Sequence, residues 1–317
     1  MSSQHQRVFG PVVSRRLGMS LGVDLVPMKT CSFNCIYCQI GKTACTTVER
    51  GRFSDPEQLV AEVSEVLGSR RDVDYVTLSG SGEPTLEVAI GEIIHRLKSV
   101  SDKPIAILTN GSMFTNADVR QAVLEADLIA PSLDAATESV FRKVNRPHES
   151  VTLDTLIAGL EALRREYTGA IWLEVMLLKG VNDDETHLRK LARLVQRIRP
   201  DRVQLNTAVR PPADVNVRPL GQQEMEAARQ IFGLEAEIIA EVEPDLRHPE
   251  ASRQHETAII SLASRRPVTA EEISIAAGTH PAETAKLLAM LERQGKLSRK
   301  VHGDKTFYTA TSHPDAT

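Results

Sequence analysis

The sequence lacks the features that would place the chain in a membrane or outside the cell. No apolar stretch approaches the ~20 residues needed to cross a bilayer, and the opening residues MSSQHQRVFG lack the apolar core of a secretory signal. The 317 residues include only four cysteines, and the net charge of -4 argues against a protein that coats nucleic acid nonspecifically. We therefore expect a cytoplasmic protein whose thiols stay reduced.

Three of the four cysteines, Cys31, Cys35 and Cys38, lie within eight residues. Thiolates at this spacing can bind one corner of an iron–sulfur cube and leave the fourth iron without a protein ligand, which implies a small-molecule ligand. Structural zinc with Cys45 as a fourth ligand is an alternative, but such sites usually take two separated cysteine pairs. We favour Cys45 as a small, buried side chain over a role in chemistry or as a labile extra ligand.

Short β-branched runs alternate with amphipathic stretches between residues 20 and 210, which predicts repeated βα units around a parallel sheet. Strands are expected at Leu21–Val26, Val73–Leu78, Ile105–Leu108, Leu128–Pro131, Ala170–Leu178 and Val203–Leu205. Helices are expected at Pro56–Leu67, Val88–Val100, Ala117–Glu125, Leu153–Tyr167 and Glu185–Ile198. The first of these helices should begin after Ser54 or Asp55 and stop at Gly68.

Each predicted strand leads into a polar or glycine-rich cluster. The first leads into the cysteine loop, and the others are followed by clusters that begin at Ser79, Thr109, Ser132, Lys179 and Asn206. The carboxyl ends of such strands gather reactive groups, so a shared site explains the clusters better than unrelated turns do. In the second cluster, Gly80 and Gly82 allow close approach of the backbone to a ligand, and Glu83 supplies a carboxylate for an ammonium.

The cysteine spacing and the Gly80-Ser81-Gly82-Glu83 cluster resemble the motifs of radical S-adenosylmethionine (SAM) enzymes. The resemblance implies that Cys31, Cys35 and Cys38 bind a 4Fe-4S cluster whose open iron takes the amine and carboxylate of S-adenosyl-L-methionine. It places Tyr37 beside the adenine and Gly80, Gly82 and Glu83 at the methionine amine. The residues best placed for the ribose hydroxyls, carboxylate and adenine are Asn110, Ser132, Asp134 and Asn206. Reductive cleavage of SAM would release a 5′-deoxyadenosyl radical.

Further segments resemble one group within these enzymes, the iron–sulfur oxidoreductases related to the wyosine-type tRNA-modifying enzymes. They are GVDLVPMKTCSFNCIYCQIGKT, SGSGEPTL, PSLDA, LLKGVND and QLNTAVRPP. The resemblance implies a partial (β/α)6 barrel and an electron donor such as flavodoxin or ferredoxin. The tRNA enzymes carry extra cysteines for a second cluster, whereas residues 1–30 here contain none, so wyosine synthesis itself is not expected.

The substrate is left open between RNA and a protein or small metabolite. A rival of another class is an iron–sulfur redox sensor that binds DNA, although a sensor has no need of the Gly80–Glu83 cluster. Arg146 with His148, and Arg210 ahead of two prolines, are candidates for holding an anionic substrate or are ordinary surface charges.

The tail is expected to form a second domain, with 1–240 as the first domain, 241–255 as a linker and 256–317 as the second. A helix around Gln222–Ile231 should precede the linker. Helices expected at Gln254–Ala263, Ala270–Ala277 and Ala282–Gln294, followed by a hairpin, resemble a winged helix. The third helix is electrostatically neutral, and the basic residues lie in the wing at Lys296, Arg299, Lys300 and Lys305. We therefore expect docking of a substrate or partner rather than sequence-specific DNA reading, with RNA engagement left open.

Overall fold

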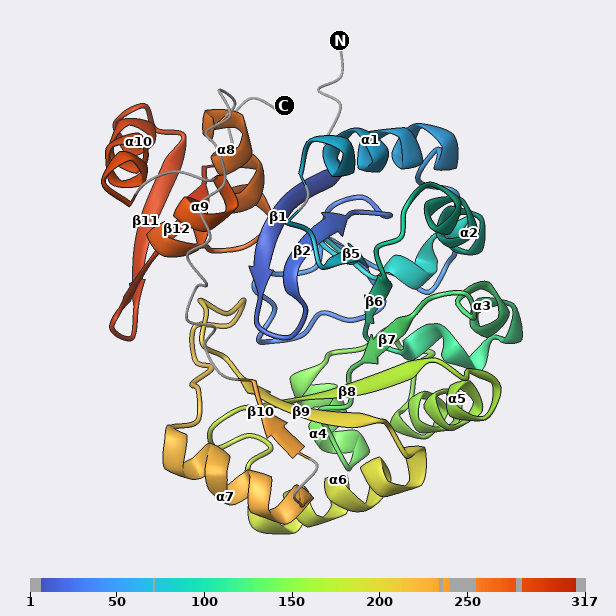
Figure 1. Cartoon of the computed structure of the whole chain (residues 1–317). Helices are drawn as coiled ribbons and strands as arrows, with labels where there is room; N and C mark the ends of the chain where they lie inside the picture. Colours follow the sequence, from blue (N-terminus) through green and yellow to red (C-terminus); the bar gives the residue numbers. More distant parts are fainter. Residues whose placement is uncertain (1–6, 71, 234–235, 240–254, 278–280, 312–317) are drawn as a thin grey trace.

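A single large sheet organises the molecule, for which a computed structural model describes residues 7–70, 72–233, 236–239, 255–277 and 281–311 (Figure 1). Its strand order is β1-β2-β5-β6-β7-β8-β9-β10, with β1 antiparallel to β2 and every other neighbouring pair parallel. The strands are β1 (Val8–Ser14), β2 (Gly18–Val23), β5 (Tyr75–Leu78), β6 (Ile105–Thr109), β7 (Leu128–Pro131), β8 (Ala170–Leu177), β9 (Arg202–Thr207) and β10 (Ala236–Ile238).

Helices cover the outer face of this sheet, as Figure 1 shows, and bury its main apolar core. They include α1 (Pro56–Ser69), α2 (Ile90–Val100), α3 (Ala117–Ala122), α5 (Leu153–Glu166) and α6 (Glu185–Ile198), with α4 (Glu138–Val144) and α7 (Gln222–Phe232) near the later strands. The six predicted strands correspond to β2 and β5–β9, whereas β1, β10 and α4 were not predicted. The Asp55 side chain caps α1 by accepting from the backbone N–H of Glu57 and Gln58. The predicted stop at Gly68 is wrong, because this glycine continues the helix.

The sheet curls enough for side chains of the β1–β2 turn to reach β8 and β9. Arg15 and Arg16 lie in the turn between β1 and β2, yet Arg16 Nη2 is 3.0 Å from Glu174 Oε1 on β8 and Arg15 Nη1 is 2.9 Å from Asn206 Oδ1 on β9. We call the enclosed side of the sheet, away from the helices, its inner face. Near the amino ends of the strands, apolar side chains close this face; they are Leu17, Ala106 and Leu128, packed with Tyr75, Leu108, Ala170 and Trp172.

The C-terminal region, residues 255–311, consists of three helices followed by an antiparallel hairpin. Its elements are α8 (His255–Arg265), α9 (Ala270–Ala277), α10 (Pro281–Arg293), β11 (Leu297–His302) and β12 (Lys305–Ala310). A separate apolar cluster joins Val12 of β1 to Ile259, Leu262 and Ile273 of this region. Apart from His255, the predicted linker lies outside the described residues. Within the described ranges, no helix has the length and hydropathy needed to cross a membrane.

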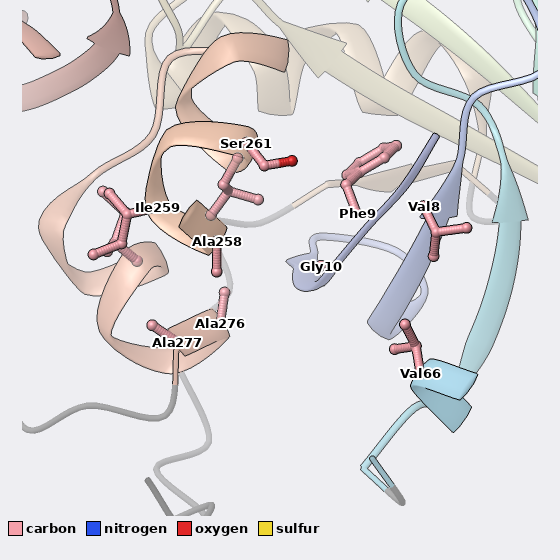
Figure 2. A pocket seen from close by; sticks show the side chains of 11 residues that line it. Val8, Phe9, Gly10, Val66, Ala258, Ile259, Ser261, Ala276 and Ala277 are labelled. Carbon is pink, nitrogen blue, oxygen red and sulfur yellow. The ribbon is translucent and has the colours of Figure 1, made fainter. Parts of the chain in front are cut away.

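A small cleft lined mainly by apolar residues remains where the C-terminal region meets β1 and α1 (Figure 2). Phe9 and Val8 from β1 line it together with Val66, Ala258 and Ala276. The C-terminal region therefore packs directly on the first strand of the sheet.

Candidate functional site

The three clustered cysteines lie in the segment that follows β2. Cys31 ends the short strand β3 (Thr30–Cys31), which pairs in parallel with β4 (Cys45–Thr46). Cys31, Cys35 and Cys38 are half-buried, whereas Cys45 is exposed. The interpretation of Cys45 as a buried side chain is therefore wrong, because β4 consists of two residues that both face solvent.

Hydrogen-bond donors approach the sulfur atoms of the cysteine loop. The backbone N–H of Phe33 lies 3.4 Å from Cys31 Sγ, and the side-chain amide of Asn110 lies 3.5 Å from the same sulfur. The side-chain amide of Asn145 lies 3.6 Å from Cys35 Sγ. Burial, with a smaller contribution from Glu83, raises the pKa of Cys31 to about 12, so this thiol needs a nearby positive charge to ionise.

Glu83 is a buried carboxylate that joins the ends of β5 and β6. Its Oε1 accepts from Thr109 Oγ1 at 2.6 Å and from the backbone and hydroxyl of Thr85, and its Oε2 accepts from the backbone N–H of Asn110 at 2.8 Å. Burial raises the pKa of Glu83 in spite of these donors. Asn110 in turn donates to Ser32 Oγ at 2.8 Å, so Glu83 is tied to the cysteine loop through one residue.

The glycines beside Glu83 allow two segments of the protein to pack closely. Gly80 has a φ of +135°, and a Cβ there would collide with the Asp24 carboxylate. A Cβ at Gly82 would collide with the carbonyl oxygen of Thr30, the residue before Cys31. The structure thus gives each glycine a protein neighbour, and contact between this backbone and a ligand stays a prediction.

Asp134 is a second buried carboxylate that is tied to the cysteine loop. Its Oδ2 accepts from Tyr37 Oη and from Asn145 Nδ2, both at 2.6 Å, and its Oδ1 accepts from the backbone N–H of Met176 at 2.9 Å. Burial raises the pKa of Asp134 to about 6. The sequence predicted Tyr37 and Asp134, but it gave no sign that Asn145 would join them to Cys35.

The remaining predicted residues lie on the inner face. Ser132 forms an isolated bridge with Glu174, and Asn206 donates to Glu174 Oε1 at 2.8 Å while accepting from Arg15. Burial favours a higher pKa for Glu174, but Arg16, Asn206 and Arg15 outweigh burial and hold it below its ordinary value. Asn206 is therefore held within a charged cluster that the sequence did not predict.

Two buried polar atoms in this cluster have no hydrogen-bond partner among the described residues, Arg16 Nη1 and Gln204 Oε1. Gln204 stands opposite Glu174 in the β8–β9 ladder and shares its face of the sheet with Asn206. Alternation along β9, where Val203 and Leu205 pack in the main core, was the one sequence signal that could have identified Gln204.

The basic residues proposed to hold an anionic substrate already have partners in the protein. Arg146 Nη2 lies 3.0 Å from Asp214 Oδ2, and His148 Nδ1 lies 2.8 Å from Ser150 Oγ. Arg210 donates to Gln39 Oε1, close to Cys38, and forms an ion pair with Glu272 of α9. Arg210 therefore connects the cysteine loop to the C-terminal region.

Comparison with known proteins identifies the family. A model described as the radical SAM superfamily matches residues 25–192, a range that holds the three cysteines, Glu83 and Asp134. The chain belongs to the radical SAM superfamily. Radical SAM proteins are enzymes that bind a 4Fe-4S cluster and SAM.

The chain is also similar to individual proteins and to solved structures. A UPF0026 protein of Helicobacter pylori is 33% identical over 96% of this chain and 97% of its own length. A Brachyspira hyodysenteriae protein named GTPase Obg is 37% identical over 93% of this chain, which spans only 44% of that relative. A radical SAM methyltransferase from Sphaerobacter thermophilus shares the fold, with a TM-score of 0.53, 20% identity and coverage of 69% of this chain and 65% of that structure.

The donor set around the cysteines fits a 4Fe-4S cluster. Cluster irons balance the charge of buried thiolates, and N–H groups directed at the sulfurs stabilise the ligated form. Within the described residues, no three His, Cys, Asp or Glu side chains form a group suited to a metal ion. Thiolates of a cluster each bind a different iron, so they need not converge on one point.

Proposed function

We propose that Cys31, Cys35 and Cys38 hold the 4Fe-4S cluster, that Glu83 receives the SAM ammonium, and that the enzyme modifies a substrate on the inner face of a partial (β/α)6 barrel. When bound, the cluster and SAM supply a 5′-deoxyadenosyl radical after one-electron reduction by a donor such as flavodoxin or ferredoxin. Tyr37, Gly80, Gly82, Asn110, Ser132, Asp134 and Asn206 complete the proposed SAM site. We further propose domains at 1–240 and 256–317, the second a winged helix.

The observation that carries this proposal is the pair of hydrogen-bonded paths from the cysteine loop to two buried carboxylates. One path runs from Cys31 through Asn110 to Glu83, and the other from Cys35 through Asn145 to Asp134. Each path fixes a carboxylate beside the cysteines before any ligand binds. A cationic group of a ligand bound there would compensate the burial that raises the pKa of Glu83.

We place the substrate on the inner face because two polar atoms there are unpaired among the described residues. Arg16 Nη1 can donate and Gln204 Oε1 can accept one more hydrogen bond, and both atoms are buried. Arg15 and Arg16 together exceed the charge of Glu174 by one, which favours a substrate with a negative group or an exposed carbonyl oxygen. A nucleotide of RNA and a phosphorylated or carboxylated metabolite both satisfy this requirement.

Charge pairing at two basic residues in and next to the hairpin supports a second candidate function beside RNA modification. Lys296 pairs with Glu256, and Arg299 Nε lies 3.6 Å from Glu292 Oε1. Two of the four basic residues through which RNA engagement was left open therefore already have acidic partners. Modification of a protein or small metabolite is for this reason retained as the second candidate function.

The proposal is tested by anaerobic reconstitution with iron and sulfide, followed by reduction in the presence of SAM. We expect 5′-deoxyadenosine and methionine from the intact enzyme, slowly even without substrate. The substrate is then found by adding fractions of deuterated cell extract and measuring deuterium in 5′-deoxyadenosine. Ribonuclease or protease treatment of the active fraction separates RNA from protein, and a filtrate of low molecular mass identifies a metabolite.

Stoichiometric zinc without iron after reconstitution would overturn the proposal. So would an iron-loaded, reduced enzyme that never cleaves SAM. Specific binding of duplex DNA, lost on oxidation of the cluster and without SAM cleavage, would establish the redox sensor instead.

A further inference from the structure

A buried arginine of the C-terminal region reaches the loop that precedes Glu83. Arg265, the last residue of α8, forms an ion pair with Asp24, and each side chain is only 4% exposed. The Arg265 guanidinium also lies over the Phe9 ring, 4.3 Å from its centroid. Burial lowers the pKa of Arg265 to about 10, so the side chain remains protonated at neutral pH.

Asp24 transmits this contact to the glycine-rich loop. Its Oδ1 accepts from the backbone N–H of Ser81 at 2.6 Å, and its Oδ2 accepts from Ser81 Oγ at 2.9 Å. Arg265 Nη1 lies 3.5 Å from Ser81 Oγ. The Asp24 carboxylate also occupies the space that a side chain at Gly80 would need.

The contact between Asp24 and Ser81 depends on the ion pair between Asp24 and Arg265. Asp24 can fix the Ser81 backbone only while its buried charge has a partner, because an unpaired buried carboxylate draws in water or a proton. Arg265 supplies that partner from a region outside the curled sheet. Glu83 follows Ser81 by two residues and its backbone N–H donates to the Thr30 carbonyl at 3.0 Å, so a shift of the loop would reach the cysteine segment.

We propose that Arg265 is a positioning residue for SAM, and that the C-terminal region completes the SAM site through Arg265, Asp24 and Ser81 instead of serving only to dock a partner. This inference rests on the proposed function only where it concerns SAM. The link between Arg265 and the order of the loop holds whatever the ligand is.

The test compares Arg265→Met with the double variant Arg265→Met/Asp24→Asn in the full-length, anaerobically reconstituted enzyme. The Asp24→Asn change keeps an acceptor for the Ser81 amide and removes the charge that Arg265 balances. Arg266→Met is the matched control, because Arg266 pairs with Glu272 of the same region, 3.1 Å away. Three quantities are measured: amide hydrogen exchange at Gly80–Glu83 without SAM, the Kd for SAM, and iron content.

We expect Arg265→Met to speed exchange of the Ser81 amide and to raise the Kd for SAM, each by about tenfold or more, with iron content unchanged. The double variant should return both values to within about threefold of the intact enzyme. Arg266→Met should change neither. If Arg265→Met does not fold, Arg265→Gln and its pairing with Asp24→Asn carry the same comparison, because glutamine also removes the charge that balances Asp24.

Unchanged exchange and unchanged SAM affinity in Arg265→Met would overturn the inference. A double variant as impaired as the single one would also overturn it, since Arg265 would then act through folding of the C-terminal region alone. If the intact enzyme binds no SAM, the proposed function fails, and the exchange measurement still decides whether Arg265 orders the loop.

Discussion

Two regions, the rim formed by the carboxyl ends of the strands and the seam between the sheet and the C-terminal region, stabilise their carboxylates in opposite ways. At the rim, Glu83 and Asp134 accept from neutral hydroxyl, amide and backbone donors, and neither forms an ion pair within the described part of the chain. At the seam, Asp24 and Glu272 pair with arginines. Neutral donors fix a carboxylate in place without balancing its charge, so the rim can still accept a cationic group, whereas the seam is already neutralised. The predictions below test this difference.

The largest effect is expected at the rim itself, from Cys35→Ala. Loss of one thiolate leaves an iron of the cluster without its ligand, so the reconstituted protein should lose most of its iron and all SAM cleavage. Because Cys35 is only half-buried, the thermal unfolding midpoint of the cluster-free chain should change little. Cys45→Ala is the control and should keep its iron. Full iron content in Cys35→Ala would contradict the cluster assignment.

The second-largest effect is expected from removal of the Glu83 charge at the rim, which should weaken SAM binding. Glu83→Ala should raise the Kd for SAM about ten- to a hundredfold while iron is retained, since a charge-assisted hydrogen bond contributes roughly 1.5 to 3 kcal/mol. Glu87→Ala is a matched control, because Glu87 is also buried but accepts from Phe53, Ser54 and Ala89. Equal losses of affinity in both variants would show that loop order, not the Glu83 charge, binds SAM.

A smaller effect is expected from a substitution at Gln204 on the inner face, and this substitution should raise the stability of the protein. Gln204→Leu removes a buried acceptor that lacks a partner among the described residues, so the free energy of unfolding should rise by about 1 to 3 kcal/mol while turnover of the true substrate falls. Asn206→Leu is the contrast: both ends of the Asn206 amide are hydrogen-bonded, and this variant should be less stable than the parent. Denaturant unfolding distinguishes the two. A Gln204→Leu enzyme that turns over substrate normally would remove Gln204 from the substrate site.

The smallest effect should come from a buried base, the imidazole of His187. His187 Nε2 accepts from the backbone N–H of Ala136 at 3.2 Å, and burial lowers the pKa of this imidazole. Between that lowered pKa and the unfolded value of about 6.5, the unfolded chain binds the proton and the folded chain does not. Stability should therefore fall as pH drops below about 6.5. In His187→Gln the fall in melting temperature between about pH 7 and pH 5 should be smaller; an identical fall would assign the acid sensitivity elsewhere.

Much of the parallel sheet was predictable because its signals are local. The bounds of β7 and α6 agree residue for residue with those expected from β-branched runs and amphipathic spacing. The antiparallel strand β1 was missed, since Gly10 and Pro11 interrupt its pattern, and α4 was missed because it has only seven residues. The helices of the C-terminal region were predicted, but their contact with the glycine-rich loop was not.

The sequence by itself determined the cysteine spacing, the positions of the parallel strands along the chain and the placement of Glu83 and Asp134 at strand ends, because short-range spacing and strand periodicity are properties of neighbouring residues. Only the tertiary structure decided that Asn145 would reach Cys35, that Arg16 would cross to Glu174, and that Arg265 would neutralise Asp24. These contacts join segments far apart in the chain. A buried polar group forms its hydrogen bonds with the groups that the fold places nearby, and a local sequence pattern does not predict which groups these are.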